Sequence, residues 1–152
     1  MSEIIRKSHN VSRLIYHVVC PIKYRHDIID DKIRKTIFRT CNSISESHEL
    51  YFIEVGTDVN HVHFLLQSVP TYSPTQIVSD VKSIIARAVF KYHPYIKKQL
   101  WGGELWSDGY YVVTVSEANT ESVVADYVRD QGNGHYVAIA LEGLQVGPNS
   151  SL

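Results

Sequence analysis

The chain has 152 residues, of which 44% are hydrophobic and 20% charged, with 15 Lys plus Arg against 16 Asp plus Glu. This length and composition predict one globular domain with its own core, and they exclude a collagen-like, disordered or low-complexity chain. No apolar run approaches the roughly 20 residues that cross a bilayer, and the first residues lack the apolar stretch of a secretory signal, so a cytoplasmic protein is expected. Two cysteines are too few for a disulfide framework.

Positive and negative charges are segregated along the chain, although the formal net charge is only −1. Residues 1–39 hold nine Lys or Arg and four Asp or Glu, and residues 80–98 hold five and one, whereas residues 40–79 contain no Lys or Arg. If the basic blocks share a face, they form the kind of local surface that binds phosphates. The alternative interpretation is that the two basic blocks are simply the solvent-exposed faces of two helices.

The first half of the chain contains three predicted strands and one predicted helix. Residues 13–20 are rich in β-branched and aromatic side chains and end at Pro21, which is typical of a strand. Residues 31–47 carry apolar side chains at the three-to-four spacing of an amphipathic helix. Residues 50–57 and 61–69 are strand-like and are separated by turn-forming residues, which predicts a hairpin.

The second half predicts a helix, a strand and a further helix. Ser73 before Pro74 is typical of a helix start, and this helix is expected to end at His93, before the next proline. Residues 110–116 form a fourth predicted strand, and residues 120–133 form a third predicted helix that ends at glycines.

The order of these elements, β-α-β-β-α-β, is that of the α+β ferredoxin-like (RRM-like) fold, a four-stranded antiparallel sheet with two helices on one face. The third helix is an addition at the C-terminal end. We expect a single domain over residues 1–134, followed by a tail, residues 135–152, that docks in part and then frays.

His61 and His63 are two residues apart on a predicted strand, so both imidazoles project from the same face while Val62 points to the other. Two imidazoles side by side can coordinate one divalent metal ion through two nitrogens. The alternative interpretation is a pair of hydrogen-bonded strand histidines without a metal, because short motifs often match by chance.

Tyr127 and Gln131 are four residues apart on the third predicted helix and therefore lie on one helical face. A phenol with an unperturbed pKa near 10 is a poor nucleophile at neutral pH, but a metal ion that draws charge from a phosphate makes its attack feasible. Gln131 can supply a neutral oxygen as a third ligand beside the histidines, and such an open site suits Mg²⁺ or Mn²⁺ better than structural zinc. The alternative for Tyr127 is a half-buried helix tyrosine.

Four segments together carry a resemblance to a known family. They are Tyr16-His17-Val18-Val19 with Lys23-Tyr24-Arg25, then His61-Val62-His63, then Leu100-Trp101 through Trp106 with Tyr110 to Val115, and finally Tyr127-Val128-Arg129-Asp130-Gln131. These segments resemble the single-tyrosine HUH transposases of small insertion sequences, the TnpA-type enzymes of the REP-related tyrosine transposase superfamily. The order and spacing agree from residue 13 to residue 131, which is more specific than any one motif.

The resemblance implies a DNA transposase that cuts and rejoins single-stranded DNA at insertion-sequence ends. Tyr127 would form a 5′-phosphotyrosine, and His61, His63 and Gln131 would hold the Mg²⁺ or Mn²⁺ ion. The family also implies a homodimer in which the tyrosine helix serves its own chain or the partner's. No membrane and no small-molecule cofactor are expected.

The chain departs from the family at two positions. Asn60 stands where an acidic residue usually precedes the first histidine, and Ser116 stands where glycine usually follows the last strand. The first change affects the side chains that would orient the metal-binding histidines, a role for which Asp58 is a candidate substitute. The second affects how the helix bearing Tyr127 is hinged.

The resemblance also suggests that hairpins near the ends of the element dock on a basic surface. Tyr24 lies between two cations and is a candidate for stacking on an unpaired base. Trp106 and Trp101 are expected in the core or in dimer packing, and His17 either lines the site from the adjacent strand or satisfies a core hydrogen bond. The candidate DNA-binding residues are Arg13, Lys23, Tyr24, Arg25, Lys82, Arg87 and Lys91.

Two rival functions remain open on the sequence. The same fold serves as a non-catalytic module that binds single-stranded nucleic acid or hairpins through aromatic side chains on its sheet, here Tyr16, Tyr51 and Tyr110. The other rival is a hydrolase in which the metal activates water and Tyr127 takes no part.

Overall fold

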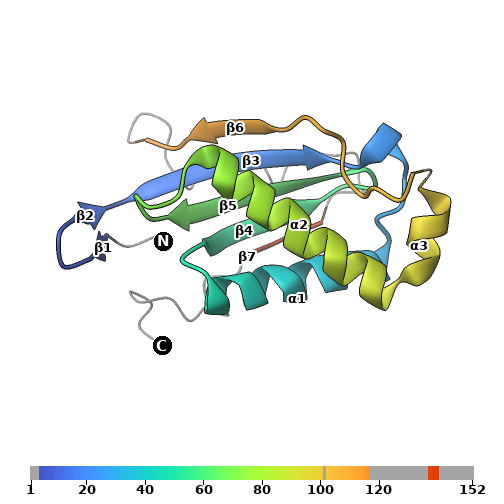
Figure 1. Ribbon diagram of the computed structural model, residues 1–152, viewed down its shortest axis with the longest axis horizontal. Coiled ribbons are helices and arrows are strands. Elements are labelled where there is room, and N and C mark those ends of the chain that lie inside the picture. The colour runs from blue at the N-terminus through green and yellow to red at the C-terminus, as the bar shows by residue number, and fades with distance from the viewer. Residues whose placement is uncertain (1–3, 101, 117–136, 141–152) are drawn as a thin grey trace.

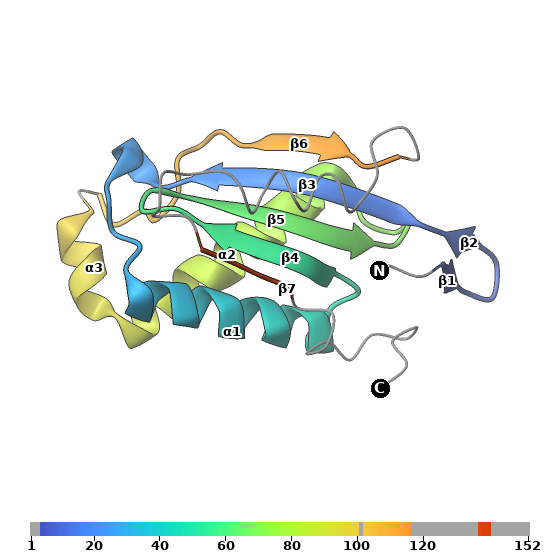
Figure 2. The same ribbon diagram turned by 180° about the vertical axis from the view of Figure 1, so that it is seen from behind.

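The centre of the protein is a five-stranded antiparallel sheet with the strand order β6-β3-β5-β4-β7. The computed structural model describes residues 4–100, 102–116 and 137–140. Helices α1 (Asp31–Ser47) and α2 (Pro74–Tyr92) lie against one face of the sheet (Figure 1), and the view from behind shows the opposite face (Figure 2). The strands are β3 (Leu14–Pro21), β4 (Tyr51–Thr57), β5 (His61–Ser68), β6 (Tyr111–Thr114) and β7 (Val137–Ala140).

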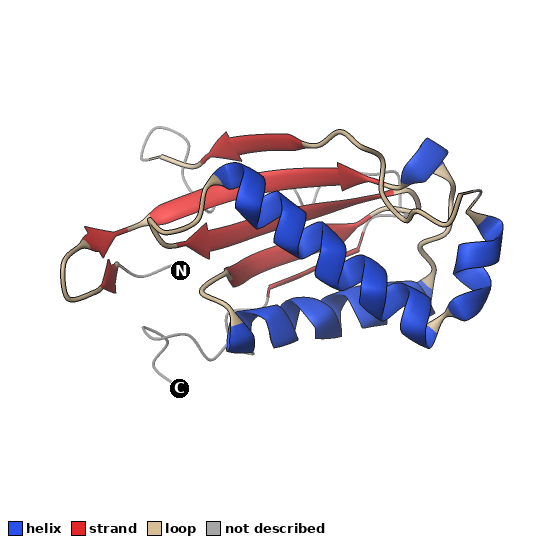
Figure 3. Cartoon of the chain, viewed as in Figure 1, coloured by secondary structure: helices blue, strands red, loops and turns tan. Residues whose placement is uncertain are grey.

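The predicted fold class is confirmed. Strands β6, β3, β5 and β4 and the two helices have the order and pairing of a ferredoxin-like fold. Figure 3 shows the strands gathered in one sheet with the helices packed against it. The third helix predicted over residues 120–133 lies outside the described residues, as do Tyr127 and Gln131. The boundary between a domain and a tail at residue 134 stays a prediction, although β7 pairs with β4 beyond it.

Both long helices begin at a side chain that caps them, and the start at Ser73 was predicted. The Asp30 side chain accepts a hydrogen bond from the Ile33 backbone N–H at the start of α1, and Ser73 accepts one from Gln76 at the start of α2, so each side chain satisfies a backbone donor that the helix leaves unpaired. α2 ends at His93, as expected. None of the helices described by the structure is long and apolar enough to cross a membrane.

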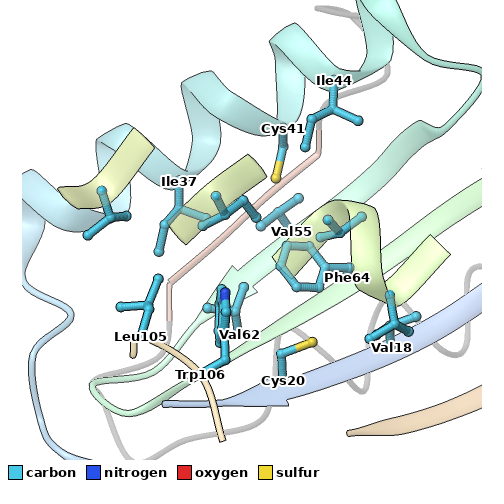
Figure 4. Packing of buried hydrophobic residues seen from close by; sticks show 14 of the residues in the cluster. Val18, Cys20, Ile37, Cys41, Ile44, Val55, Val62, Phe64, Leu105 and Trp106 are labelled. Carbon is cyan, nitrogen blue, oxygen red and sulfur yellow. The ribbon is translucent and has the colours of Figure 1, made fainter. Parts of the chain in front are cut away.

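The main hydrophobic core lies between the two helices and the sheet (Figure 4). Alternate residues of the strands, such as Val18 of β3 and Phe64 of β5, point into it and meet Ile37 of α1 and Ile85 of α2. Trp106 is 93% buried in this cluster, so the expectation that it packs in the core is confirmed, whereas Trp101 lies outside the described residues.

Several short elements were not predicted. β1 (Ile5–Arg6) pairs with β2 (Val11–Ser12), α3 (Pro94–Gln99) follows α2, and a 3₁₀ turn, η1 (Lys23–Arg25), follows β3. β7 adds a fifth strand next to β4. These elements span two to six residues, which is too short to establish a hydrophobic period of 2 or 3.6.

The sheet face opposite α1 and α2 is partly apolar and partly polar. Ile15, Leu65 and Val115 form a small buried cluster there with Ile53. Because β3 and β5 alternate between faces, the same side of the sheet also carries His17, His61 and His63. We call this side the histidine face.

Candidate functional site

The structure brings the two motif histidines together at one end of β5. Their ring centroids are 5.0 Å apart with an angle of 65° between the planes. Val62, between them in sequence, points to the other face and is fully buried in the main core. The core contact of Val62 therefore fixes the direction of both imidazoles.

Asn60 holds the ring of His61. The Asn60 Oδ1 atom lies 2.8 Å from Nδ1 of His61, and its Nδ2 donates to the Asp27 carboxylate at 3.3 Å. Burial lowers the pKa of His61, and Arg25 lowers it further, while Asp58 opposes the shift. Asp58 accepts a hydrogen bond from the Val59 backbone. The hydrogen bond that orients His61 therefore comes from Asn60.

His17 on β3 completes a cluster of three imidazoles. Its Nε2 lies 3.1 Å from Nδ1 of His63, and both side chains are buried. Burial lowers the pKa of His63 to about 3, with His61 and His17 adding to the shift, and burial also lowers the pKa of His17. Of the two alternatives left open for His17, the structure places it at the site. The rings are thus neutral near pH 7, which is the form that binds metal ions.

Two further residues on the histidine face were missed by sequence reasoning. Glu54 of β4 pairs with Leu65, is only 2% exposed and places a carboxyl group on this face. Tyr111 of β6 contacts His17 edge-on, with ring centroids 6.2 Å apart. The signal for Glu54 was a single charged residue in an otherwise apolar strand, which the strand assignment left unexplained.

The η1 turn stands beside the His61 end of the site. The backbone N–H of Ile22 donates to the Asn60 carbonyl at 2.8 Å, which joins the start of the turn to the turn before β5. Tyr24 and Arg25 both have φ of 55°, a left-handed conformation that costs about 1–3 kcal/mol per residue outside glycine. Tyr24 is 62% exposed, and Lys23 lies over its ring at 5.4 Å.

The other candidate DNA-binding residues lie away from the histidines. Lys82 of α2 donates to the Ser107 carbonyl at 2.8 Å and to the Gly109 carbonyl at 3.2 Å, so its ammonium group holds the loop before β6. Arg87 and Lys91 are exposed on α2, which covers the opposite face. Arg13 is exposed at the far end of β3. Their contacts with DNA stay predictions.

The two imidazoles do not by themselves form a complete set of metal ligands. Within the described ranges, no group of three His, Cys, Asp or Glu side chains is placed to hold a metal ion. Gln131, the predicted third ligand, lies outside these ranges. What the described residues do provide is a pair of neutral, oriented nitrogen donors on one face.

Comparison with known proteins decides the family. Residues 10–131 match the family described as "Transposase IS200 like". The chain belongs to the IS200-like transposase family. It is 32% identical over 121 residues to the ISDra2 transposase TnpA of Deinococcus radiodurans, which covers 80% of this chain and 86% of that protein. It is 26% identical over 116 residues to the IS200 transposase of Salmonella typhimurium, covering 76% and 75% of the two chains.

Solved structures agree with this membership. A Deinococcus radiodurans protein described as a transposase superimposes with a TM-score of 0.69 at 28% identity, over 84% of this chain and 97% of that one. A REP-associated tyrosine transposase, solved with a bound REP hairpin, superimposes with a TM-score of 0.56 at 9% identity, over 85% and 71%. The second likeness shows the fold alone. The IS200-like transposase described here is thus an enzyme of DNA recombination.

The buried histidines predict that the metal-free transposase loses stability in mild acid. His63 has a pKa of about 3 when folded and near 6.5 when unfolded, so the unfolded state binds more protons between these values and stability falls as pH falls below about 6.5. From pH 7 to pH 5 this one group should remove about 2 kcal/mol of unfolding free energy. Urea unfolding in EDTA at the two pH values measures it.

The variant His63→Asn should show a pH-dependent loss that is smaller by about this amount. His48→Asn makes the same chemical change outside the site and serves as the control. An equal loss in wild type and His63→Asn would show that His63 is not held neutral by the fold.

Proposed function

We propose that this transposase cuts and rejoins single-stranded DNA at insertion-sequence ends through a metal-assisted 5′-phosphotyrosine intermediate. The observation that supports the proposal most is the pair of neutral imidazoles at His61 and His63, which share one face and each have Nδ1 engaged. Tyr127 is the proposed nucleophile. It comes from the motif that the sequence shares with the family.

His61, His63 and Gln131 would hold Mg²⁺ or Mn²⁺. Imidazole nitrogens and an amide oxygen leave positions open for phosphate oxygens and water, which fits a catalytic ion. When bound, the ion would withdraw charge from the phosphate under attack and so compensate for the weak nucleophilicity of a phenol.

The reaction is a balanced exchange of phosphodiester bonds. The phenolic oxygen of Tyr127 forms a bond to phosphorus, the bond from phosphorus to the 3′ oxygen breaks, the phenol loses its proton and the 3′ oxygen gains one. The products are a 5′-phosphotyrosine and a free 3′-hydroxyl, and attack by another 3′-hydroxyl reverses the step and joins new ends. Because one ester replaces another, no external energy source is needed.

The structure weighs against the module that binds RNA through sheet aromatics. Such a module needs its aromatic rings on the open face of the sheet. Tyr16 is 7% exposed and belongs to the core under the helices, and Tyr51 is 9% exposed in another buried cluster. Only Tyr110 of the three candidates is exposed. Two of the three candidate rings are therefore not available for stacking on the open face of the sheet.

We propose that single-stranded DNA with hairpins at the ends of the element is the substrate. A transposase with the same fold was solved bound to a REP hairpin. The properties of the η1 turn support binding of the single-stranded DNA beside the proposed metal site. Its exposed Tyr24 is flanked by two cations, and its backbone strain is the kind that persists where a function requires it. The turn is also joined to Asn60, next to His61.

Tyr24 gives a specific binding prediction. Tyr24→Ala should weaken binding of single-stranded DNA by about 1–3 kcal/mol, whereas Tyr24→Phe, which keeps the stacking face, should bind like the wild type. Fluorescence anisotropy with a labelled oligonucleotide measures the affinities. Tyr92→Ala, at an equally exposed tyrosine on α2, is the matched control. An equal loss for Tyr24→Ala and Tyr92→Ala would mean that Tyr24 has no special role.

The proposed mechanism is tested by trapping the covalent intermediate. The wild type, incubated with labelled hairpin-bearing single-stranded DNA and Mg²⁺ or Mn²⁺, should give an adduct that resists denaturant, and Tyr127→Phe should give none. Replacing His61 and His63 by Ala should abolish the adduct while hairpin binding survives, because phosphate contacts are spread over many cations.

Each rival predicts a different pattern in the same experiment. A hydrolase that activates water would cleave the DNA in both the wild type and the Tyr127→Phe variant, and neither protein would form an adduct. A binding module would do neither. Cleavage by the Tyr127→Phe variant at the wild-type rate would overturn the assignment of the nucleophile.

We also propose a homodimer. β6 pairs with β3 and with no other described strand, so its second edge offers backbone donors and acceptors for pairing between sheets of two chains. Tyr127 of one chain would then serve the site of its own chain or that of the partner. Sedimentation at micromolar concentration should show a dimer, and a monomer alone would contradict this part of the proposal.

A further inference from the structure

A neutral imidazole carries its proton on one of its two ring nitrogens, and only the other nitrogen can bind a metal ion. The hydrogen-bond partner of the ring decides which nitrogen that is. Two histidines that share one ion therefore both need partners that fix the position of the proton.

For His61 the partner is unambiguous. The Asp27 carboxylate only accepts hydrogen bonds, so the amide group of Asn60 that faces it at 3.3 Å is the NH₂ group. The Asn60 oxygen then faces His61 at 2.8 Å and has to receive a proton from Nδ1. The nitrogen of His61 left for a metal ion is Nε2.

For His63 the partner is a second imidazole. Nδ1 of His63 lies 3.1 Å from Nε2 of His17, and the ring planes differ by only 19°. The ring centroids are 5.4 Å apart. This is close to the 3.1 Å between the two nitrogens plus one ring radius on each side. The two nitrogens thus point at each other along the line between the rings, as in a hydrogen bond rather than a face-to-face stack.

This contact admits two arrangements of one proton. If His17 donates from Nε2, a neutral His63 carries its own proton on Nε2 and cannot bind an ion there. If His63 donates from Nδ1, its Nε2 is free of a proton and matches Nε2 of His61. Only the second arrangement gives two equivalent donors on the histidine face.

We propose that His17 is a positioning residue, which accepts a hydrogen bond from Nδ1 of His63 and so keeps the Nε2 atom of His63 ready for the metal ion. The inference rests on the proposed function, because it assumes that an ion binds to His61 and His63. His17 would not contact the ion itself. Its own orientation is fixed by β3, where it is 6% exposed, and by a T-shaped contact with the Tyr111 ring, whose centroid lies 6.2 Å from that of His17.

Two variants test whether His17 acts as a hydrogen-bond acceptor or only through packing. His17→Phe keeps a flat ring but removes the acceptor, and it should weaken Mn²⁺ binding by about 10- to 100-fold, the usual effect of losing a group behind a metal ligand. His17→Gln supplies an amide oxygen that can accept from His63 and should recover most of the affinity. Mn²⁺ titration followed by electron paramagnetic resonance, without DNA, gives the dissociation constants. His48→Phe is the control for the chemical change.

The proton positions are measured independently in the metal-free wild type. ¹⁵N NMR of the histidine rings should show protons on Nδ1 of both His61 and His63, a result that does not depend on any variant folding. A proton on Nε2 of His63, or equal Mn²⁺ affinity in the wild type and His17→Phe, would overturn the inference. So would a wild type that binds no Mn²⁺.

These outcomes are distinct from failure of the proposed function. If the wild type forms no covalent adduct with DNA while Mn²⁺ binding depends on His17 as stated, the phosphotyrosine proposal fails and the role of His17 stands. If the adduct forms but neither the affinity nor the proton positions depend on His17, the inference fails alone.

Discussion

The antiparallel pairing of β3 with β5 is the constraint on which the site depends. Residues alternate between the two faces of a sheet, so the register that buries Val18 and Phe64 beneath the helices also puts His17 and His63 together on the opposite face. A slip of one residue would exchange the two sets and place the imidazoles in an apolar core. The free energy that stabilises the core therefore also selects the geometry of the histidines. The candidate site needs no further structural element to bring them together.

Neutral partners, rather than a carboxylate, orient both proposed ligands. Asn60 stands where the resemblance led us to expect an acidic residue, and its amide is aligned by Asp27. An amide oxygen fixes the position of the proton on His61 as a carboxylate would, but it polarises the ring less because it carries no charge. His63 has an imidazole in the corresponding role. Asn60 thus keeps Nε2 of His61 available for the metal ion, and it places less negative charge next to the ring than a carboxylate would.

Sequence patterns predicted the fold well, since the strand-like composition, the apolar spacing of α1 and the capping serine of α2 are local signals. The pairing of His61 with His63 on one face followed from the alternation of side chains along a strand. The contact between His17 and His63 joins residues 46 positions apart, and no local pattern distinguishes it from other alignments of the two strands. The left-handed backbone at Tyr24 was equally hidden, because tyrosine gives no signal for a positive φ, whereas glycine would.

We expect His61 and His63 to present the same ring nitrogen, Nε2, to one divalent ion. Anomalous X-ray scattering from crystals of the transposase soaked in Mn²⁺ would locate that ion. One manganese ion should lie within bonding distance of both Nε2 atoms, with the contact between His17 and His63 retained. An ion bound through Nδ1 of either ring, or manganese bound only elsewhere on the protein, would contradict it.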